Sequence, residues 1–330
     1  MAEGVGAVRP IEAVIPRLRA RGRSHPWADA AHYRLLQILA LTVLATVLLI
    51  AWEALSGALP AMRAYGFRFL MSTEWDPVAE RFGALPYLYG TLMSSALALL
   101  LALPLGLGTA VYLSELAPPR VGSAVAFIVE LLASIPSIVY GLWGLFVLAP
   151  FLRANIEPWL IAHWGFLPLF RGFPFGIGML NAAIVLAVMI LPTIVSISRE
   201  ILLSMPRALR ESALALGATR AEAIAVTLDV ARPGILGAVI LALGRALGET
   251  MAVTMVIGNT NRISASLLAP GATMASVIAN EFSEATTKLH LSALIEIAFV
   301  LLMVTMLVNS FARVLVIWST GGRRDVAGAA

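Results

Sequence analysis

The sequence contains no cysteine and few charged residues, and both absences narrow the chemistry open to it. With Cys 0 among 330 residues, a disulfide framework, a thiolate metal site and a cysteine nucleophile are all excluded. Charged residues make up 13% of the chain, about half the share found in an average soluble domain. Hydrophobic residues make up 60%. A soluble globular protein of this size is therefore excluded.

The sequence also lacks the motifs of several enzyme classes. No phosphate-binding loop of the form GxxxxGK[ST] occurs, so the chain cannot hydrolyse ATP by itself. Catalytic residues do not cluster anywhere, so an enzyme is not predicted. The histidines have no pair at the spacing of metal ligands, and we expect neither a metal site nor a cofactor at His25, His32, His163 or His290.

Long apolar runs are what the sequence has in abundance. A bilayer core requires roughly 20 mostly apolar residues per helix. Six segments meet this requirement and together make up nearly half the chain: 35–55, 87–113, 124–149, 177–203, 233–258 and 291–318. We therefore predict an all-α, polytopic membrane protein with about six transmembrane helices in one domain, 35–318.

Basic residues predict the orientation of these spans. The N-terminal arm, 1–34, carries six arginines and is too long and too charged for a standard cleaved signal peptide, so we expect the first span to be retained. If the arm is cytoplasmic, six spans return the tail, 319–330, to the same side. The inner segments then carry about twice as many basic residues as the outer ones, in agreement with the positive-inside rule. We expect a multi-pass protein of the cell membrane with both termini in the cytoplasm.

Topology alone does not distinguish a channel, a transporter and a membrane enzyme. The spans are rich in small residues and proline, as in the stretch from Ser134 through Pro136 and Ser137 to Gly141. Small residues permit close helix contact, and an intramembrane proline frees a carbonyl that protein or water must satisfy. This composition fits a moving, water-lined pathway, and it also fits kinked helices that only pack.

The segment 204–232, between the fourth and fifth spans, is expected to form two short cytoplasmic helices. Ser204 is a suitable N-cap, with Pro206 just inside the first helix. Gly217 suits the left-handed position that ends this helix. Thr219 then begins the second helix, with Glu222 three residues later as the other half of a capping box. Gly217 is therefore the predicted corner.

Three interpretations of this segment compete. Leu209, Ala213 and Leu216 recur at helical spacing, so one face of the first helix is apolar. A DNA-binding helix-turn-helix lacks its third helix and core here, and no nucleic-acid partner is expected. The apolar face either packs on the membrane domain or docks with a cytoplasmic partner, as an amphipathic helix does in a groove.

The residues of this loop resemble the EAA loop of the permeases of ABC importers. Glu211, Ser212 and Ala213, followed by Gly217, match the motif except that Ser212 replaces its second residue. The segment 227–230 also differs from the family's usual Ile-x-Leu-Pro. The resemblance implies a coupling helix that docks in a cleft of an ATPase subunit, through Glu211, Ser212, Ala213, Gly217, Thr219 and Glu222.

The fifth span contains two charges. Arg245 and Glu249 are four residues apart, which on a continuous helix places them on one face within reach of a salt bridge. Charges at membrane depth are costly and usually face a bundle interior or a water-filled cavity. Two interpretations stay open: a structural ion pair, or an anion pathway in which Glu249 balances the charge of Arg245.

Three runs resemble the phosphate-specific (Pst) permease family, and within it the PstC-type subunit. They are GRALGETMAVT at 244–254, SIPSIVYGLWGLF at 134–146 and SLLAPGATMASVIANEF at 266–282, and the likeness extends over about 69–318. The resemblance implies the MetI-like fold of ABC-importer permeases and import of inorganic phosphate. The implied pathway residues are Arg245, Glu249, Thr250, Ser134, Ser137 and Tyr140.

The same resemblance implies a set of partners. These are a PstA-like permease subunit in a heterodimer, a PstB-like ATPase dimer, a PstS-like phosphate-binding protein and the lipid bilayer. The alternatives are the PstA-like sister subunit itself and a permease for another oxyanion, sulfate or molybdate. A secondary transporter without an ATPase is less favoured, because the sequence shows no long paired repeats.

Overall fold

The structure, a computed structural model, describes residues 26–321 of the chain. Most of the predicted arm, 1–34, and of the predicted tail, 319–330, lies outside the described residues. The chain divides into two compact units, Met1–Glu53 and Ala54–Ala330. The described part of the first unit is the beginning of one long helix, α2 (Pro26–Tyr65). The other elements belong to the second unit.

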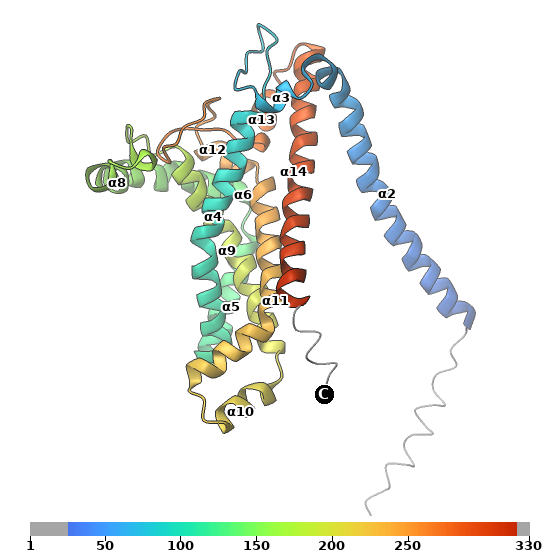
Figure 1. Cartoon of the computed structure of the whole chain (residues 1–330), viewed down its shortest axis with the longest axis vertical. Coiled ribbons are helices and arrows are strands. Elements are labelled where there is room, and N and C mark those ends of the chain that lie inside the picture. The colour runs from blue at the N-terminus through green and yellow to red at the C-terminus, as the bar shows by residue number, and fades with distance from the viewer. Residues whose placement is uncertain (1–25, 322–330) are drawn as a thin grey trace, which may run out of the picture. The chain divides into compact units, whose positions relative to one another are not determined.

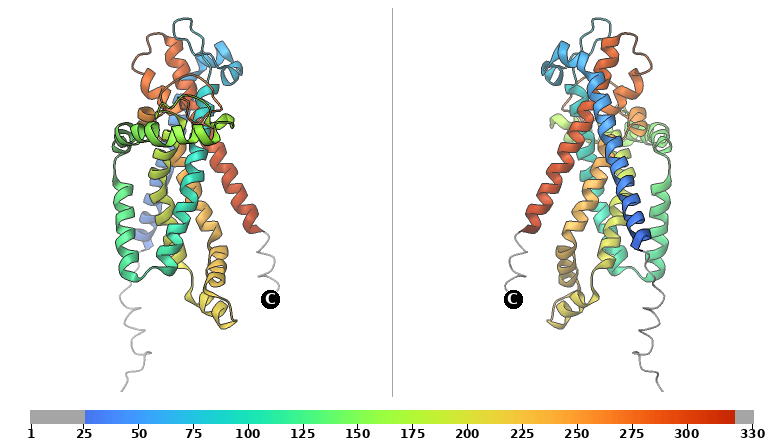
Figure 2. Two further views of the ribbon diagram at one scale, coloured as in Figure 1. Left: turned by 90° about the vertical axis from the view of Figure 1, so that its left-hand side faces the viewer. Right: turned by 90° about the vertical axis from the view of Figure 1, so that its right-hand side faces the viewer.

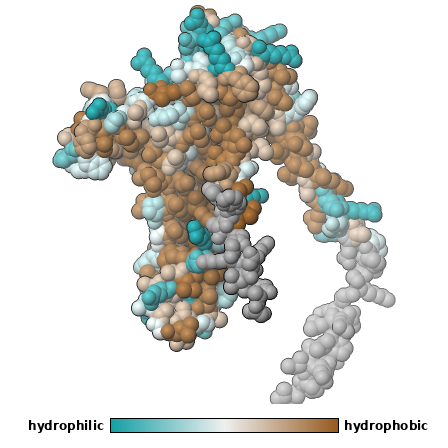
Figure 3. Space-filling view, in the orientation of Figure 1, coloured by the Kyte–Doolittle hydropathy of each residue, from teal (hydrophilic) through white to brown (hydrophobic). Residues whose placement is uncertain are grey.

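Five helices of the second unit run in roughly one direction (Figures 1 and 2). They are α4 (Leu85–Val111), α5 (Pro119–Ser134), α9 (Met179–Ser204), α11 (Arg220–Gly248) and α14 (Lys288–Gly321). The α4 helix continues into a π-helical segment, η2 (Tyr112–Leu116). Figure 3 shows apolar residues along the sides of this bundle and polar residues gathered at the end that carries α3 (Arg68–Met71) and α13 (Met274–Glu281).

The core of the bundle lies between α4 and α9. These helices approach closely at Gly106, where a Cβ atom would lie 2.9 Å from Ile194 Cγ2. Small residues of α4, such as Ala98 and Ala102, face larger side chains of α9, such as Ile190, and all three are fully buried. Glycine and alanine thus permit the close helix contact that membrane interfaces require.

The prediction of an all-α protein with six membrane-spanning helices is confirmed. In the described residues, six helices are long and apolar enough to cross a bilayer. At the end of the bundle away from the loop 204–232, the last part of α2 packs on α14. There Ser292 Oγ accepts a hydrogen bond from Ala61 N at 3.0 Å and donates one to Gly57 O at 2.8 Å.

The predicted third span, 124–149, is wrong as one helix. α5 ends at Ser134, and Ile135 and Pro136 are extended, with ψ of 129° and 141°. Proline has no N–H and disfavours the helical conformation of the residue before it, so it breaks the apolar run. α5 has 16 residues, about 24 Å of helix, and stands upright in the bundle (Figure 2).

A second helical run follows this break and lies across the end of the bundle (Figures 1 and 2). It is long and apolar enough to span a membrane by composition, but its direction differs from that of the upright helices. Its segments are α6 (Ser137–Trp143), η3 (Gly144–Leu148), α7 (Ala149–Phe151), η4 (Leu152–Ile156) and α8 (Glu157–Trp164), followed by the short η5 (Pro168–Phe170).

The loop 204–232 differs from the prediction at two points. The first loop helix, α10 (Arg207–Ala215), has Pro206 as its N-cap, and Ser204 is the last residue of α9. Ser204 Oγ donates to Ile201 O at 2.7 Å instead of capping. The second loop helix is not separate, because α11 runs without interruption through Pro233 into the fifth span. At its far end α11 stops at Gly248, and the short α12 (Met251–Val256) follows.

Candidate functional site

The break between α11 and α12 separates the two charges of the fifth span. Glu249 is extended, with φ of −69° and ψ of 126°, so it does not share a helix with Arg245. Its carboxylate Oε1 instead accepts a hydrogen bond from Ala252 N, at 3.4 Å, in the first turn of α12. The ion pairs of residues 26–321 do not include one between Arg245 and Glu249, so the interpretation as a structural ion pair gains no support.

Arg245 lies on an open face of α11. Arg245, Gly248 and Leu241 are all exposed within this chain, Leu241 to 58%, and they follow one another at helical spacing. The glycines of α11 differ in how closely the chain packs on them. A Cβ at Gly244 would lie 3.5 Å from Asn309 Nδ2 of α14, whereas nothing lies within 4 Å of one at Gly248. The face that carries Arg245 is thus left uncovered by the other elements of Ala54–Gly321.

The two helix breaks are brought together by contact between α6 and α12. A Cβ at Gly141 would lie 2.7 Å from Met255 Sδ and 3.0 Å from Ala252 Cα. The break after α5 and the break after α11 therefore lie in one neighbourhood. Non-helical backbone at membrane depth is tolerated where protein surrounds it or where it lines a water-filled cavity.

The other predicted pathway residues flank these breaks. Ser134, exposed at the end of α5, donates to Leu131 O at 2.7 Å. Tyr140 is buried, and its hydroxyl donates across the break to Leu132 O at 2.7 Å. Ser137, at the start of α6, and Thr250, just before α12, are half-buried, and Thr250 Oγ1 donates to Gly248 O at 3.3 Å.

The corner at Gly217 forms as its local sequence indicates. Gly217 has φ of +89°. Thr219 Oγ1 accepts from Glu222 N at 3.3 Å, and Thr219 N donates to Glu222 Oε2 at 2.7 Å, which completes the capping box. The bond from Thr219 N and a further one that Thr219 Oγ1 donates to Glu222 Oε2 at 2.9 Å hold the pKa of the Glu222 carboxyl below its usual value.

The α10 helix presents its predicted docking residues to solvent. Glu211 and Ser212 are exposed, and Ala213 is half-buried. Leu216, at the end of the predicted apolar stripe, is 90% exposed. Leu209 and Ala213 of the same stripe are half-buried, so only its Leu216 end is left open within the described residues.

Sequence analysis missed one contact of this loop. Arg210 of α10 forms an ion pair with Glu115 of η2 and donates a second hydrogen bond from the same Nη2 atom to Leu202 O at 3.1 Å. The two charged residues are 95 positions apart, and no local motif connects them. The available signal was one acidic residue at the inner end of the second span, in a region otherwise rich in arginine.

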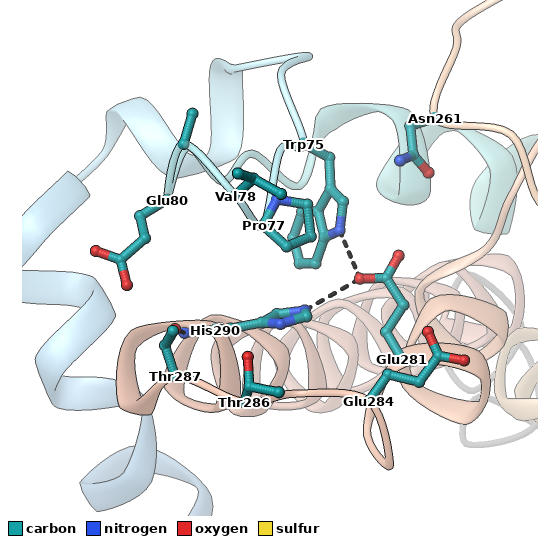
Figure 4. Close-up of a pocket in the computed structure, with 11 residues that line it drawn as sticks. Trp75, Pro77, Val78, Glu80, Asn261, Glu281, Glu284, Thr286, Thr287 and His290 are labelled. Carbon is teal, nitrogen blue, oxygen red and sulfur yellow. Dashed lines mark hydrogen bonds and ion pairs between the residues drawn. The ribbon is translucent and has the colours of Figure 1, made fainter.

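A separate cavity of about 670 Å³ lies at the opposite end of the bundle. Glu281 Oε2 lies at its centre, accepts from Trp75 Nε1 at 2.8 Å and contacts His290 Nε2 at 3.1 Å (Figure 4). Glu80 and Glu284 also line the cavity. Three carboxylates make the local potential unfavourable for an oxyanion, so this cavity is not a candidate for anion passage.

Comparison with known proteins decides the class of the chain. Residues 102–317 match the family described as "Binding-protein-dependent transport system inner membrane component". The chain belongs to this family. It is therefore a multi-pass membrane permease component, and the rival classes of secondary transporter and membrane enzyme are set aside.

Curated relatives match this permease component over most of its length. The "Phosphate transport system permease protein PstC" of Mesorhizobium japonicum is 44% identical over 312 residues, which cover 92% of this chain and 95% of that protein. The protein of the same name from Xylella fastidiosa strain Temecula1 is 45% identical over 280 residues, covering 83% and 86%.

A solved structure supports the fold of this permease component. An inward-facing MetNI methionine ABC transporter has a TM-score of 0.53 and 19% identity, and the match covers 75% of this chain and 100% of that one. At this identity the likeness concerns the fold alone. The predicted MetI-like permease fold is confirmed.

Proposed function

We propose that this permease component is the PstC-type subunit of an ATP-driven importer of inorganic phosphate. The names of its relatives indicate the substrate. The observation that carries the proposal is Arg245, a cation exposed on α11 beside two interrupted helices. Since a charge at membrane depth usually faces a bundle interior or a water-filled cavity, the open face of α11 is the proposed wall of the anion pathway.

The surroundings of Arg245 support passage of an anion rather than charge neutralisation. Glu249 is engaged at the start of α12, so the positive potential of Arg245 is not cancelled by a direct pair. Hydroxyl groups at the two breaks add donors. Ser137, half-buried at the start of α6, is one of them.

The proposed assembly contains a PstA-like permease subunit, a PstB-like ATPase dimer and a PstS-like phosphate-binding protein. The open face of α11 would be completed by the PstA-like subunit. The proposed docking element for the ATPase is the corner around Gly217, including Glu211, Ser212 and Ala213, and its exposed Leu216 supports docking over packing. ATP binding would bring the corners of the two permease subunits together and reopen the pathway on the other side.

The proposed location is the inner membrane, with both termini in the cytoplasm and the loop 204–232 on the same side. This orientation follows from the excess of arginine in the inner segments. It places the cavity around Glu281 outside, on the side from which a binding protein would deliver phosphate.

The test of the pathway is substitution of Arg245 in the complete complex, reconstituted in vesicles. Arg245→Gln is expected to reduce phosphate uptake to background, while the amount of assembled complex and its ATP binding stay unchanged, because α11 and its packing remain. Glu249→Gln is expected to be milder. Arg313→Gln, at an exposed arginine near the end of α14, is the matched control and should retain uptake.

The double variant Arg245→Gln, Glu249→Gln separates the two interpretations. If the charges only balanced each other, the single variants would lose complex and the double variant would recover it, because no unpaired charge remains. Uptake in the double variant at the wild-type level would refute the pathway role of Arg245. Stimulation of the ATPase by sulfate or molybdate, and not by phosphate, would assign a different oxyanion.

A further inference from the structure

We infer that the Arg210–Glu115 ion pair is the contact through which the coupling corner moves α4 and α9. The inference rests on the proposed docking of an ATPase at α10. It adds two positioning residues to the transport cycle, neither of which belongs to the loop motif or to the anion pathway.

The α10 helix packs on α11, but its packing is shallow. None of its residues is buried. A small apolar cluster at the inner end of the bundle instead joins α4, α9 and α11, through Leu107, Leu202 and Ile235. α10 lies outside this cluster and is attached to α9 and α11 by the chain itself.

Arg210 connects α10 to the ends of α4 and α9 through a single atom, Nη2. Its Nη2 pairs with the carboxylate of Glu115 and donates to the carbonyl of Leu202 at 3.1 Å. The Glu115 side chain is 5% exposed and the Arg210 side chain 24%. A charge pair shielded from water in this way is weakened little by salt, and removing one partner leaves the other charge desolvated.

The position of Glu115 supports a role beyond packing. It lies in η2, where α4 widens into π-helical geometry and Ala117 N donates to Tyr112 O at 2.8 Å. Such turns are rare and occur frequently at functional positions.

The contact divides the motion of the corner into two routes. α11 follows Gly217 and Thr219 directly, because it is continuous with the corner. α4 is distant in sequence, and it receives the displacement of α10 through Arg210 and Glu115. The hydrogen bond from Arg210 to the Leu202 carbonyl transmits the same displacement to the end of α9. The α9 helix in turn packs closely on α4 at Gly106. Breaking the pair should therefore leave ATPase docking intact and disconnect part of the bundle from it.

The experiment measures phosphate taken up per ATP hydrolysed, in vesicles containing the complete complex with its ATPase and binding protein. Arg210→Gln and Glu115→Gln are each expected to lower this ratio about fivefold or more, the lower end of coupling between distant sites. ATP hydrolysis should continue. The double variant Arg210→Glu, Glu115→Arg exchanges the two charges and re-forms the pair, so it should restore much of the phosphate uptake per ATP hydrolysed. Arg120→Gln removes an exposed arginine on the same side of the membrane and is the matched control.

The outcomes distinguish this inference from the proposed function. If the wild-type complex shows no phosphate uptake, the proposed function fails. If the wild type transports and both glutamine variants keep its ratio, only the inference is overturned. Should Arg210→Gln fail to assemble, Glu115→Gln, which removes the charge but keeps a polar side chain, decides alone: a lowered ratio supports the inference, and a wild-type ratio overturns it. A purely structural pair would reduce the amount of complex and leave the ratio of the remainder unchanged, which also overturns the inference.

Discussion

Replacing Gly141 by alanine tests the contact that brings the two interrupted helices together. The added Cβ would lie 2.7 Å from Met255 Sδ and 3.0 Å from Ala252 Cα. The methionine side chain can rotate away, but Ala252 Cα is backbone, so α6 and α12 must separate by several tenths of an ångström. We expect Gly141→Ala to disturb the pathway without disturbing the loop.

The magnitude follows from two opposing terms. Overpacking in a well-packed site typically costs about 1–3 kcal/mol. Alanine in place of glycine inside a helix contributes about 1 kcal/mol in the other direction. The net effect is a destabilisation of about 1 kcal/mol, which should lower the unfolding temperature of the purified complex by a few degrees at most.

Gly108→Ala is the matched control for this substitution. Gly108 lies inside α4, and nothing would lie within 4 Å of its Cβ. Only the helix-propensity term remains there, so this variant should be as stable as the wild type or slightly more stable. Phosphate uptake should fall in Gly141→Ala and persist in Gly108→Ala. Equal stability and equal uptake in the two variants would refute the close contact between α6 and α12.

Two further predictions concern the cytoplasmic corner. Gly217→Val should destabilise the corner by about 1–2 kcal/mol, because φ is +89° at this position. Gly217→Asn should be milder, and it should keep more phosphate uptake per ATP hydrolysed than Gly217→Val. An equal ratio of uptake to hydrolysis in the two variants would contradict this prediction. Because the pKa of Glu222 is lowered in the folded state, its cap is stabilising above the unfolded value of about 4.5 and loses effect as pH falls through the lower folded value. Hydrogen exchange at the Glu222 amide should therefore accelerate in acid in the wild type. After Glu222→Gln, exchange corrected for the intrinsic effect of pH should no longer depend on pH.

Local chemistry explains which features the sequence could predict. The helix count follows from apolar runs of bilayer length. The corner follows from residues within a few positions of one another, since Gly217 alone tolerates positive φ there and Thr219 with Glu222 forms a closed pair of hydrogen bonds. These features do not depend on the remainder of the fold.

The direction of a helix and the pairing of distant charges were not predictable in the same way. Hydropathy continues unchanged across Pro136, so it predicts one span, 124–149, where the structure has the upright α5 and the crosswise α6. The spacing of Arg245 and Glu249 predicted a pair only if the helix continued, and no proline marks its end at Gly248. Glu249 found a partner in the next helix instead.

The continuous α11 joins the two candidate sites through one rigid element. The capping box lies at its first turn and Arg245 near its last, within a helix of 29 residues, about 43 Å long. Pro233 removes one hydrogen bond near the middle, and a Cβ at Gly234 would lie 2.9 Å from Ile201 Cδ1, so α11 rests closely on α9 at this point. If α11 tilts about that contact, its two arms of about 21 and 18 Å carry the corner and Arg245 in opposite senses by similar amounts. Movement of the corner toward the axis of the proposed pathway would then move Arg245 away from that axis. Alternating access requires this opposite movement when the docking element and the pathway residue lie on one helix.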